Sequence, residues 1–295
     1  PVASSGYAYS YADANNEAFR YTGEQLNTNM ECALANTLNQ IYDANSETGW
    51  MMYNDEDPSG STHSSYGHTK GVVAFDSDMG YWLVHSTPRW PDEPPATYNF
   101  PEDEKDYGQH FFCQTYTLED FNDVGTQFIL NKPYVYSSHL TEVQNSTLPN
   151  MVSVLNHDFI TTTPASNTVD LVTIGGLQVR SFAKNGDYNV TLYETIVEPG
   201  IDSGLLLETW QNGSGGKMPS FCTPTYEYDS MNVQDIQLTS SIGWTETKDH
   251  SKWGVSTDSS EWVCIGDINR VYSQDERGGG TECMINNAMW KAFNG

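Results

Sequence analysis

Residues 22–42 carry apolar side chains that recur every three or four positions. These are Leu26, Met30, Leu34, Leu38 and Ile41. The spacing places them on one face of an amphipathic helix, with the Thr22 hydroxyl available as its N-terminal cap. Residues 50–53 follow as a short apolar run that closes in the polar segment 54–65. We expect a buried strand there and then a loop.

Two further apolar runs, residues 67–75 and 81–85, are joined by Asp76-Ser77-Asp78-Met79-Gly80. Acidic, serine and glycine residues favour a tight turn, so this segment predicts a hairpin in the core. Residues 89–107 combine several prolines with many acidic residues, which predicts an irregular surface loop.

The second half of the chain repeats this arrangement of a strand that carries a polar motif and an apolar strand after it. The predicted elements are, in chain order, strands over 236–238, 250–256 and 262–266, with a turn at 258–260, and a short helix over 288–293 after Gly278-Gly279-Gly280. We expect two repeats, residues 1–150 and 151–295, within one continuous domain.

The chain has 295 residues, of which 37% are hydrophobic and 13% aromatic, so it can bury a sizeable core. It contains no run of about 18 apolar residues, which argues against a membrane span. Residues 1–10 lack the basic and apolar blocks of a signal peptide, so a secreted protein would be present here in its processed form.

Three Asn-x-Ser/Thr triplets, at Asn145, Asn189 and Asn212, lie in polar, turn-rich contexts and favour a glycosylated, secreted protein. The five cysteines do not have the spacing of a zinc site. At least one of them lacks a partner within the chain, and it is either a free thiol or paired with another chain or segment. They are Cys32, Cys113, Cys222, Cys264 and Cys283.

The formal net charge is -26 at pH 7, and protonation of all seven histidines would bring it to -19. A site for a polyanion such as DNA must therefore be a local basic island in an acidic surface. The basic residues around the motifs described next allow such an island, although an acidic surface also serves simply to keep a protein soluble. They are Lys70, Arg89, Lys248, Lys252, Arg270 and Arg277.

The same His-x-Lys triplet occurs twice, in Gly67-His68-Thr69-Lys70-Gly71 and in Asp249-His250-Ser251-Lys252-Trp253. Side chains alternate along a strand, so each histidine and the lysine two residues later share one face, about 6.5 to 7 Å apart along the chain. One such triplet is easily a surface accident. Two on matching predicted strands indicate a common site.

Two imidazoles and two ammonium groups could together cleave a phosphodiester. One histidine attacks phosphorus and forms a phosphohistidine, the other protonates the leaving oxygen, and the lysines hold the phosphate oxygens. This chemistry requires no metal ion and no other cofactor. An acidic medium suits it, because the second histidine must start protonated.

The residues around both triplets resemble the deoxyribonuclease II family, and the resemblance covers nearly the whole chain. The matching segments are Tyr66-Gly67-His68-Thr69-Lys70-Gly71-Val72 and residues 82–88 in the first half, residues 249–253, 262–270 and 277–280 in the second half, and the intermediate landmarks 207–211 and 219–222. The resemblance implies an α/β (α+β) fold of the phospholipase D-like type, with one active site between two pseudo-symmetric sheet-and-helix repeats. It also implies a metal-independent acid endonuclease that cuts double-stranded DNA and leaves 3'-phosphates.

On this basis His68 is the expected nucleophile and His250 the expected general acid, or the reverse, with Lys70 and Lys252 as phosphate clamps. His85 and Asn269 occupy matching places after the two histidines and could polarise the phosphate, although His85 could equally be a buried structural histidine. Gly266-Asp267-Ile268-Asn269 is similar to the Gly-Ser-x-Asn element of phospholipase D enzymes. Asp267, Arg270 and Arg277 are expected at the substrate.

The resemblance also implies a disulfide between Cys264 and Cys283. It places a further strand before residue 1, and a cysteine after residue 295 that would pair with Cys222. The remaining histidines match no motif, and we interpret them as ordinary surface or loop residues. They are His63, His110, His139 and His157.

Two alternatives stand beside the nuclease. A catalytically silent secreted effector or binding protein on the same fold would account for the acidic charge, but it has no need to keep both His-x-Lys pairs. A phosphatidyltransferase or lipase of the broader fold fits the local sequences around the motifs less well, and liposome turnover would identify it. The nuclease reading implies a secreted or lysosomal protein, a homodimer as one arrangement, and no membrane partner.

Overall fold

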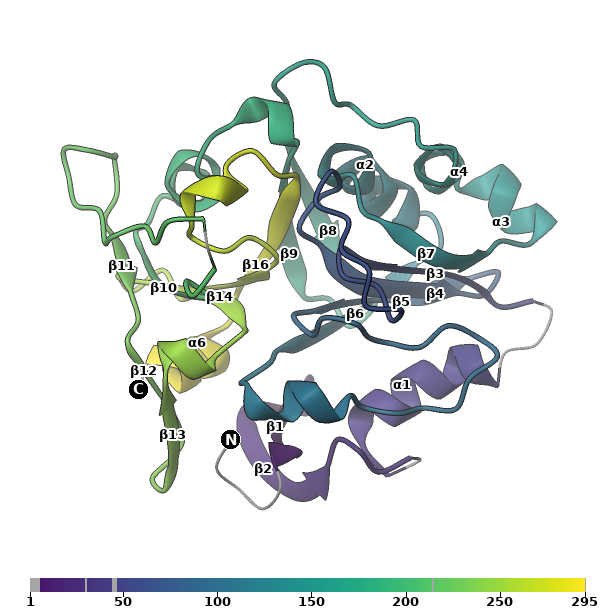
Figure 1. Ribbon diagram of the computed structural model, residues 1–295, viewed down its shortest axis with the longest axis horizontal. Helices are drawn as coiled ribbons and strands as arrows, with labels where there is room; N and C mark the ends of the chain where they lie inside the picture. The colour runs from purple at the N-terminus through teal and green to yellow at the C-terminus, as the bar shows by residue number, and fades with distance from the viewer. Residues whose placement is uncertain (1–5, 30, 44–46, 214, 295) are drawn as a thin grey trace.

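The computed structural model describes residues 6–29, 31–43, 47–213 and 215–294. Met30, which the predicted first helix included, lies outside these residues, as does Ser214 of the third glycosylation triplet. The molecule is a mixed α/β structure with two main sheets and few helices. Figure 1 shows the smaller sheet beside the larger one, with helices packed on both faces of the smaller sheet.

The smaller sheet contains five strands in the order β6-β5-β4-β3-β7, and all neighbours are antiparallel. Its strands are β3 (Gly49–Asn54), β4 (Lys70–Phe75), β5 (Met79–His85), β6 (Phe111–Thr117) and β7 (Val135–His139). The predicted strand at 50–53 and the predicted hairpin are therefore confirmed. The turn of the hairpin is closed by the Asp76 carboxylate, which accepts the backbone N–H groups of Asp78 and Met79 at 2.8 and 3.0 Å.

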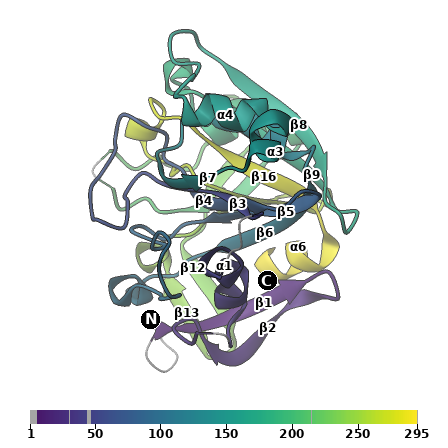
Figure 2. The same ribbon diagram turned by 90° about the vertical axis from the view of Figure 1, so that its right-hand side faces the viewer.

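Both faces of this sheet are buried, so its central strand β4 is apolar at successive positions. Val73 and Phe75 face the helices α2 (Phe121–Asn131) and α4 (Pro149–Leu155), whereas Val72 and Ala74 face α1 (Ala33–Tyr42). Figure 2 shows α1 on one side of the sheet and α4, with the short helix α3 (Glu142–Thr147), on the other.

The larger sheet contains seven strands in the order β11-β10-β14-β15-β16-β9-β8. Its strands are β8 (Ser166–Val172), β9 (Gln178–Lys184), β10 (Leu205–Thr209), β11 (Ser230–Asn232), β14 (Lys252–Ser256), β15 (Trp262–Gly266) and β16 (Gly279–Ile285). The disulfide Cys264–Cys283 joins β15 to β16, as the resemblance implied. Cys32, Cys113 and Cys222 are not disulfide-bonded.

Short elements complete the fold. The predicted strand at 236–238 is confirmed as part of β12 (Asp235–Thr239), which forms a hairpin with β13 (Ile242–Thr245), and the predicted C-terminal helix is α6 (Asn287–Asn294). The predicted loop 89–107 includes a turn of 3-10 helix, Glu102–Asp106. Further short helices are three turns of 3-10 helix, Gly186–Tyr188, Glu246–Lys248 and Tyr272–Gln274, and a π-helical turn, Tyr193–Val197, that continues into α5 (Glu198–Ile201).

The predicted helix over 22–42 is wrong in its first half. Residues 16–25 form β2 (Asn16–Gln25), which pairs antiparallel with β1 (Ala8–Asp13), and the helix α1 begins only at Ala33. Thr22 is therefore not its cap; the Cys32 sulfur accepts the Ala35 N–H instead. Gly23 adopts φ +77, a conformation outside the right-handed helical region. Pairing with β1 thus outweighs the helical spacing of the apolar residues.

Both predicted motif strands start too early. β4 begins at Lys70 and β14 at Lys252, so each histidine lies two residues before its strand. The reason is that the backbone N–H groups of His68 and His250 bond to carbonyl groups of the opposite half, Gly278 O at 2.8 Å and Gly108 O at 2.7 Å. Among the residues that the structure describes, no helix is both long and apolar enough to cross a membrane.

Candidate active site

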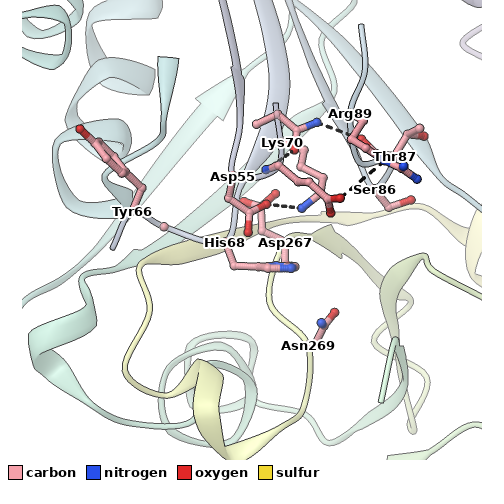
Figure 3. A network of polar contacts seen from close by, with 12 residues as sticks. Asp55, Tyr66, His68, Lys70, Ser86, Thr87, Arg89, Asp267 and Asn269 are labelled. Atoms are coloured by element: carbon pink, nitrogen blue, oxygen red, sulfur yellow. Dashed lines mark hydrogen bonds and ion pairs between the residues drawn. The ribbon is translucent and has the colours of Figure 1, made fainter. Parts of the chain in front are cut away.

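The His68 ring is held by the opposite half of the molecule. It lies just before β4, is 8% exposed, and its Nδ1 is 2.6 Å from the main-chain oxygen of Asp267, the residue that follows β15. Figure 3 shows His68 and Asp267 side by side, with Asn269 further along the same segment. Because a carbonyl oxygen can only accept, Nδ1 carries the hydrogen and Nε2 keeps the lone pair of the neutral ring.

The His250 ring is held in the same way from the other direction. Its Nδ1 is 2.8 Å from the main-chain oxygen of Ser86, the residue that follows β5. Its ring lies edge-on to the Trp210 ring, with centroids 5.0 Å apart. The two halves therefore exchange one His–carbonyl hydrogen bond each, and both rings present Nε2 as the reactive nitrogen.

Lys70 is fixed by an ion pair. Its Nζ donates to the carboxylate of Asp55, which directly follows β3, and Arg277 of the other half binds the same carboxylate at 3.0 Å. Figure 3 shows Asp55 and Lys70 in contact next to His68. Burial alone would raise the pKa of Asp55, but Lys70, His68 and Arg277 hold it well below its usual value. Asp55 is therefore ionised throughout the working pH range.

Lys252 has a different environment. It is 1% exposed, and its Nζ donates to the main-chain oxygen of His250. Within the described residues, no carboxylate lies within 4.0 Å of this ammonium group. Burial, and then the charge of Lys70, lower its pKa to about 7. Lys252 therefore changes charge near neutral pH.

The two histidines and two lysines form one electrostatic cluster. Burial holds the pKa of His68 well below its usual value, and the charges of Lys70 and Lys252 lower it further. Burial has the same effect on His250, again with Lys252 and Lys70 and also with His68. The structure thus brings together all four residues of the two motifs, and burial disfavours the protonated form of both rings.

His85 and Asn269 lie at the ends of the same two strands, but the structure does not match them with each other. The His–carbonyl bonds match Ser86 with Asp267, so His85 corresponds to Gly266. The His85 Nδ1 accepts the Thr87 N–H at 3.2 Å, and its buried Nε2 has no hydrogen-bond partner among the described residues.

Asn269 is likewise unsatisfied. Its backbone N–H donates to the Gln274 side chain at 2.6 Å, while its own Oδ1 is buried and has no partner within the part of the chain that the structure describes. Unpaired buried polar atoms are costly, and they are common where a ligand completes the hydrogen bonding.

The two arginines expected at the substrate are engaged within the protein. Arg270 is 1% exposed and is bound to Glu194 at 2.9 Å and to the main-chain oxygen of Pro219 at 3.0 Å. Arg277 donates to the main-chain oxygens of Tyr66 and Gly67 at 2.9 and 3.0 Å, besides its bond to Asp55. Arg277 therefore braces the segment that leads into His68.

Four contributors were missed by the sequence analysis. Asp55 gave a weak signal, because it is the first of three successive acidic residues after an apolar strand. Gly108 and Ser86 act through main-chain oxygens, which leave no trace in side-chain identity. His110 was interpreted as an ordinary histidine, yet it is partly buried and its Nδ1 accepts the Lys252 N–H at 3.1 Å. Burial, and then Lys252, lower its pKa to about 3.

The remaining predicted sites lie away from this cluster. Asn145 on α3, Asn189 and Asn212 are all exposed, and the Asn212 amide donates to the Thr247 main-chain oxygen at 2.9 Å. The described residues contain no group of three or more His, Cys, Asp or Glu side chains that could hold a metal ion.

Comparisons with known proteins agree across the whole chain. The family model of deoxyribonuclease II matches residues 1–295. The chain is 37% identical over 298 residues to plancitoxin-1 from Acanthaster planci, with 99% of this chain and 82% of the relative covered. It is 34% identical over 317 residues to deoxyribonuclease-2 from Caenorhabditis elegans (98% and 83% covered) and 32% identical over 295 residues to deoxyribonuclease-2-alpha from Mus musculus (98% and 82% covered). The chain therefore belongs to the deoxyribonuclease II family.

Proposed function

We propose that this protein is an endodeoxyribonuclease that hydrolyses double-stranded DNA in acid, without a metal ion, through a phosphohistidine intermediate. As a family member it is a deoxyribonuclease II-like hydrolase. The observation that carries the proposal is the reciprocal exchange of hydrogen bonds, in which His68 binds Asp267 O and His250 binds Ser86 O. That exchange orients two Nε2 atoms within one cationic cluster, as an in-line displacement at phosphorus requires.

In the first step, the Nε2 lone pair of His68 attacks phosphorus and the bond from phosphorus to the 5'-oxygen breaks. The departing oxygen takes a proton from Nε2 of His250. In the second step, His250 accepts a proton from water as that water attacks phosphorus, and the bond from phosphorus to His68 breaks. The products are a 5'-hydroxyl and a 3'-phosphate, and both rings return to their starting states.

The other residues of the cluster stabilise charge. Lys70 and Lys252 neutralise the phosphate oxygens in a site where burial strengthens electrostatic interactions. The unpaired Nε2–H of His85 is a further donor toward the phosphate. We assign the side-chain NH2 group of Asn269 the same role. We assign Arg277 the role of bracing His68 and do not assign Arg270 to the substrate, because its hydrogen bonds are made within the protein.

Acid favours this site for a physical reason. Burial and neighbouring lysines hold the pKa of His250 well below its usual value, so the ring accepts its proton only at low pH or with an anion nearby. Binding of a phosphodiester supplies that negative charge. Activity should therefore fall as pH rises, even though the lysines alone would attract DNA at neutral pH.

The type of fold, the location and the oligomeric state are proposed on the same basis. We propose that residues 1–150 and 151–295 are the two repeats of a phospholipase D-like fold, each contributing one histidine and the carbonyl that holds the other. A secreted or lysosomal location fits an acid enzyme, and the exposed Asn145, Asn189 and Asn212 are its proposed glycan sites. A homodimer is compatible with this arrangement, in which each chain supplies both histidines and both of the carbonyl groups that hold them.

Cleavage of supercoiled plasmid at pH 5 in EDTA tests the proposal, with His68→Ala and His250→Ala beside the parent protein and His139→Ala as the matched control. We expect nicking by the parent and the control and none by either active-site variant. Full activity in one of those variants would overturn the two-histidine mechanism. No cleavage by the parent from pH 4 to 8 would identify the silent binding protein that its net charge of -26 also suits.

A further inference from the structure

Asp267 places a carboxyl group inside a site built for an anion. Its main-chain oxygen holds His68, while its side chain is partly exposed beside that ring. One of its carboxyl oxygens, Oδ1, is buried and has no hydrogen-bond partner among the residues that the structure describes. An ionised carboxylate at this position would repel a phosphodiester, so the group needs an explanation.

Charged and titratable groups from several elements surround the Asp267 carboxyl group. A backbone hydrogen bond from Lys70 reaches the carboxyl group, and the ammonium groups of Lys70 and Lys252 favour its ionised form. Burial outweighs both and raises its pKa to about 7. The other titratable groups that face it are Asp55, Glu282, Tyr53 and Tyr193.

The matching residue in the other half, Ser86, has hydrogen-bond partners for its side-chain hydroxyl group. Ser86 holds His250 as Asp267 holds His68, but the Ser86 hydroxyl donates to Gln109 at 2.5 Å and accepts the His110 N–H at 3.0 Å. Of these two matching side chains, Asp267 is the one that keeps an oxygen without a partner among the described residues. The two halves thus agree in backbone and differ in what their side chains can offer a ligand.

We infer that Asp267 binds the scissile phosphodiester as a neutral carboxylic acid and donates its O–H to a non-bridging phosphate oxygen. The inference rests on the proposed function and deepens it. A neutral acid supplies a strong, charge-assisted hydrogen bond to an anion, as buried carboxylic acids do in other sites. Loss of the proton replaces that donor with a negative charge, so anion affinity falls as pH rises.

Lys252 also loses its charge near pH 7, and the His250 ring is protonated only in acid or beside an anion, so several proton losses weaken anion binding in the parent protein. Replacement of Asp267 by Asn removes one of them, because an amide donates at every pH. Asp267→Ser tests the same point with a hydroxyl donor. Glu282→Gln is the matched control, because Glu282 is a buried carboxyl nearby whose partner is Ser181 at 2.9 Å.

The experiment measures binding of sulfate by calorimetry at pH 5 and pH 8, since the charge of sulfate is constant over this range. For the parent and for Glu282→Gln we expect the Kd for sulfate to rise from pH 5 to pH 8 about tenfold more than for Asp267→Asn and Asp267→Ser. The factor is about ten because pH 8 lies one unit above the Asp267 pKa of about 7. Equal rises in folded Asp267→Asn and in the parent would overturn the inference.

This measurement does not depend on turnover. A parent protein that binds sulfate in this pH-dependent manner but cuts no DNA would contradict the proposed function and support the role of Asp267. A parent that cuts DNA with a pH dependence of sulfate binding identical to that of both variants would support the function and refute the inference. Thermal melting of each variant confirms that it is folded.

Discussion

The two His-x-Lys pairs have matching backbones and different charges. In each pair the histidine precedes its strand and is held by a carbonyl of the other half, Asp267 for His68 and Ser86 for His250. Lys70 is neutralised by Asp55, whereas the Lys252 ammonium group donates to a main-chain oxygen and has no carboxylate within 4.0 Å among the described residues. The backbone therefore builds the site twice, and the Asp55 carboxylate makes the charges of the two lysines different.

This difference divides the work between the lysines. Lys70 is held by Asp55, whose carboxylate is ionised at all working pH values, and the ion pair ties β3, β4 and Arg277 of the second half together. Lys252, with a pKa of about 7, is charged in acid and neutral in base. One lysine is therefore fixed in a structural ion pair, and the charge of the other depends on pH.

The largest effect is expected from removal of either ring. His68→Ala and His250→Ala should each lower kcat for DNA by about four orders of magnitude, because each step of the displacement needs both groups. Initial rates of plasmid nicking at pH 5 measure this. A loss confined to one variant would show that one of the two rings is not needed for cleavage.

Removal of the distinguishing carboxylate should be next in size. Asp55→Asn leaves Lys70 and Arg277 buried without their counter-charge, which should cost about 3 to 5 kcal/mol of unfolding free energy. Urea unfolding at pH 7 checks this, with Asp57→Asn as the control, since the Asp57 carboxylate forms its ion pair with the partly exposed His63. Equal losses in the two variants would mean that the Asp55 network is not special.

The same ion pair has a defined pH dependence. The folded pKa of Asp55 is depressed, so its contribution to stability is present above the ordinary aspartate pKa, about 3.9, and is lost only as pH falls further toward the folded value. The stability difference between the parent and Asp55→Asn should therefore be unchanged from pH 7 to pH 5. A difference that vanished by pH 5 would contradict the assigned pairing.

The second sheet has a covalent brace, Cys264–Cys283, that closes a 19-residue separation. Loss of this loop closure in Cys264→Ala/Cys283→Ala should cost about 3 kcal/mol of unfolding free energy. The effect on kcat should be much smaller, because the neighbouring strands remain hydrogen-bonded. Urea unfolding and plasmid nicking on the same sample separate the two. A tenfold fall in kcat in protein that is still folded would show that the brace positions Asp267.

The smallest effect tests the titrating clamp. Lys252→Arg keeps a positive charge at every pH, so the rise in KM between pH 6 and pH 8 should be smaller than in the parent by about tenfold or less. At pH 5 the lysine of the parent and the arginine of the variant are both charged, so the two proteins should differ less in KM there than at pH 8. An identical rise in KM would remove Lys252 as the pH-dependent clamp.

The sequence singled out four residues that the structure brings together, but not the residues that hold them in place. The repeated triplet pointed to His68, Lys70, His250 and Lys252, because the same spacing recurred beside similar strands. Asp55 and Ser86 could not be found in this way, because the contact of Asp55 with Arg277 joins residues far apart in the chain and the contact of Ser86 is made by a carbonyl oxygen, which every residue has.

The same limit explains the error at the N-terminal end. The apolar spacing of residues 22–42 is helical, but residues 16–25 form a strand because β1 is available to pair with them. Pairing partners depend on the whole fold, whereas periodicity is local. The core hairpin Lys70–His85 was predicted correctly because its two strands and their turn are adjacent in the sequence.

Trapping the covalent intermediate tests the central claim, that the two matched histidines take different roles in one site. The substrate is thymidine 3'-(4-nitrophenyl phosphate), whose leaving group needs no proton. His250→Ala, which lacks the base for the second step, should accumulate protein that carries a thymidine 3'-phosphoryl group on His68, seen by mass spectrometry under alkaline conditions, and His68→Ala should accumulate none. The same adduct on His250 in His68→Ala would reverse the roles, and no covalent adduct in either variant would contradict the covalent mechanism.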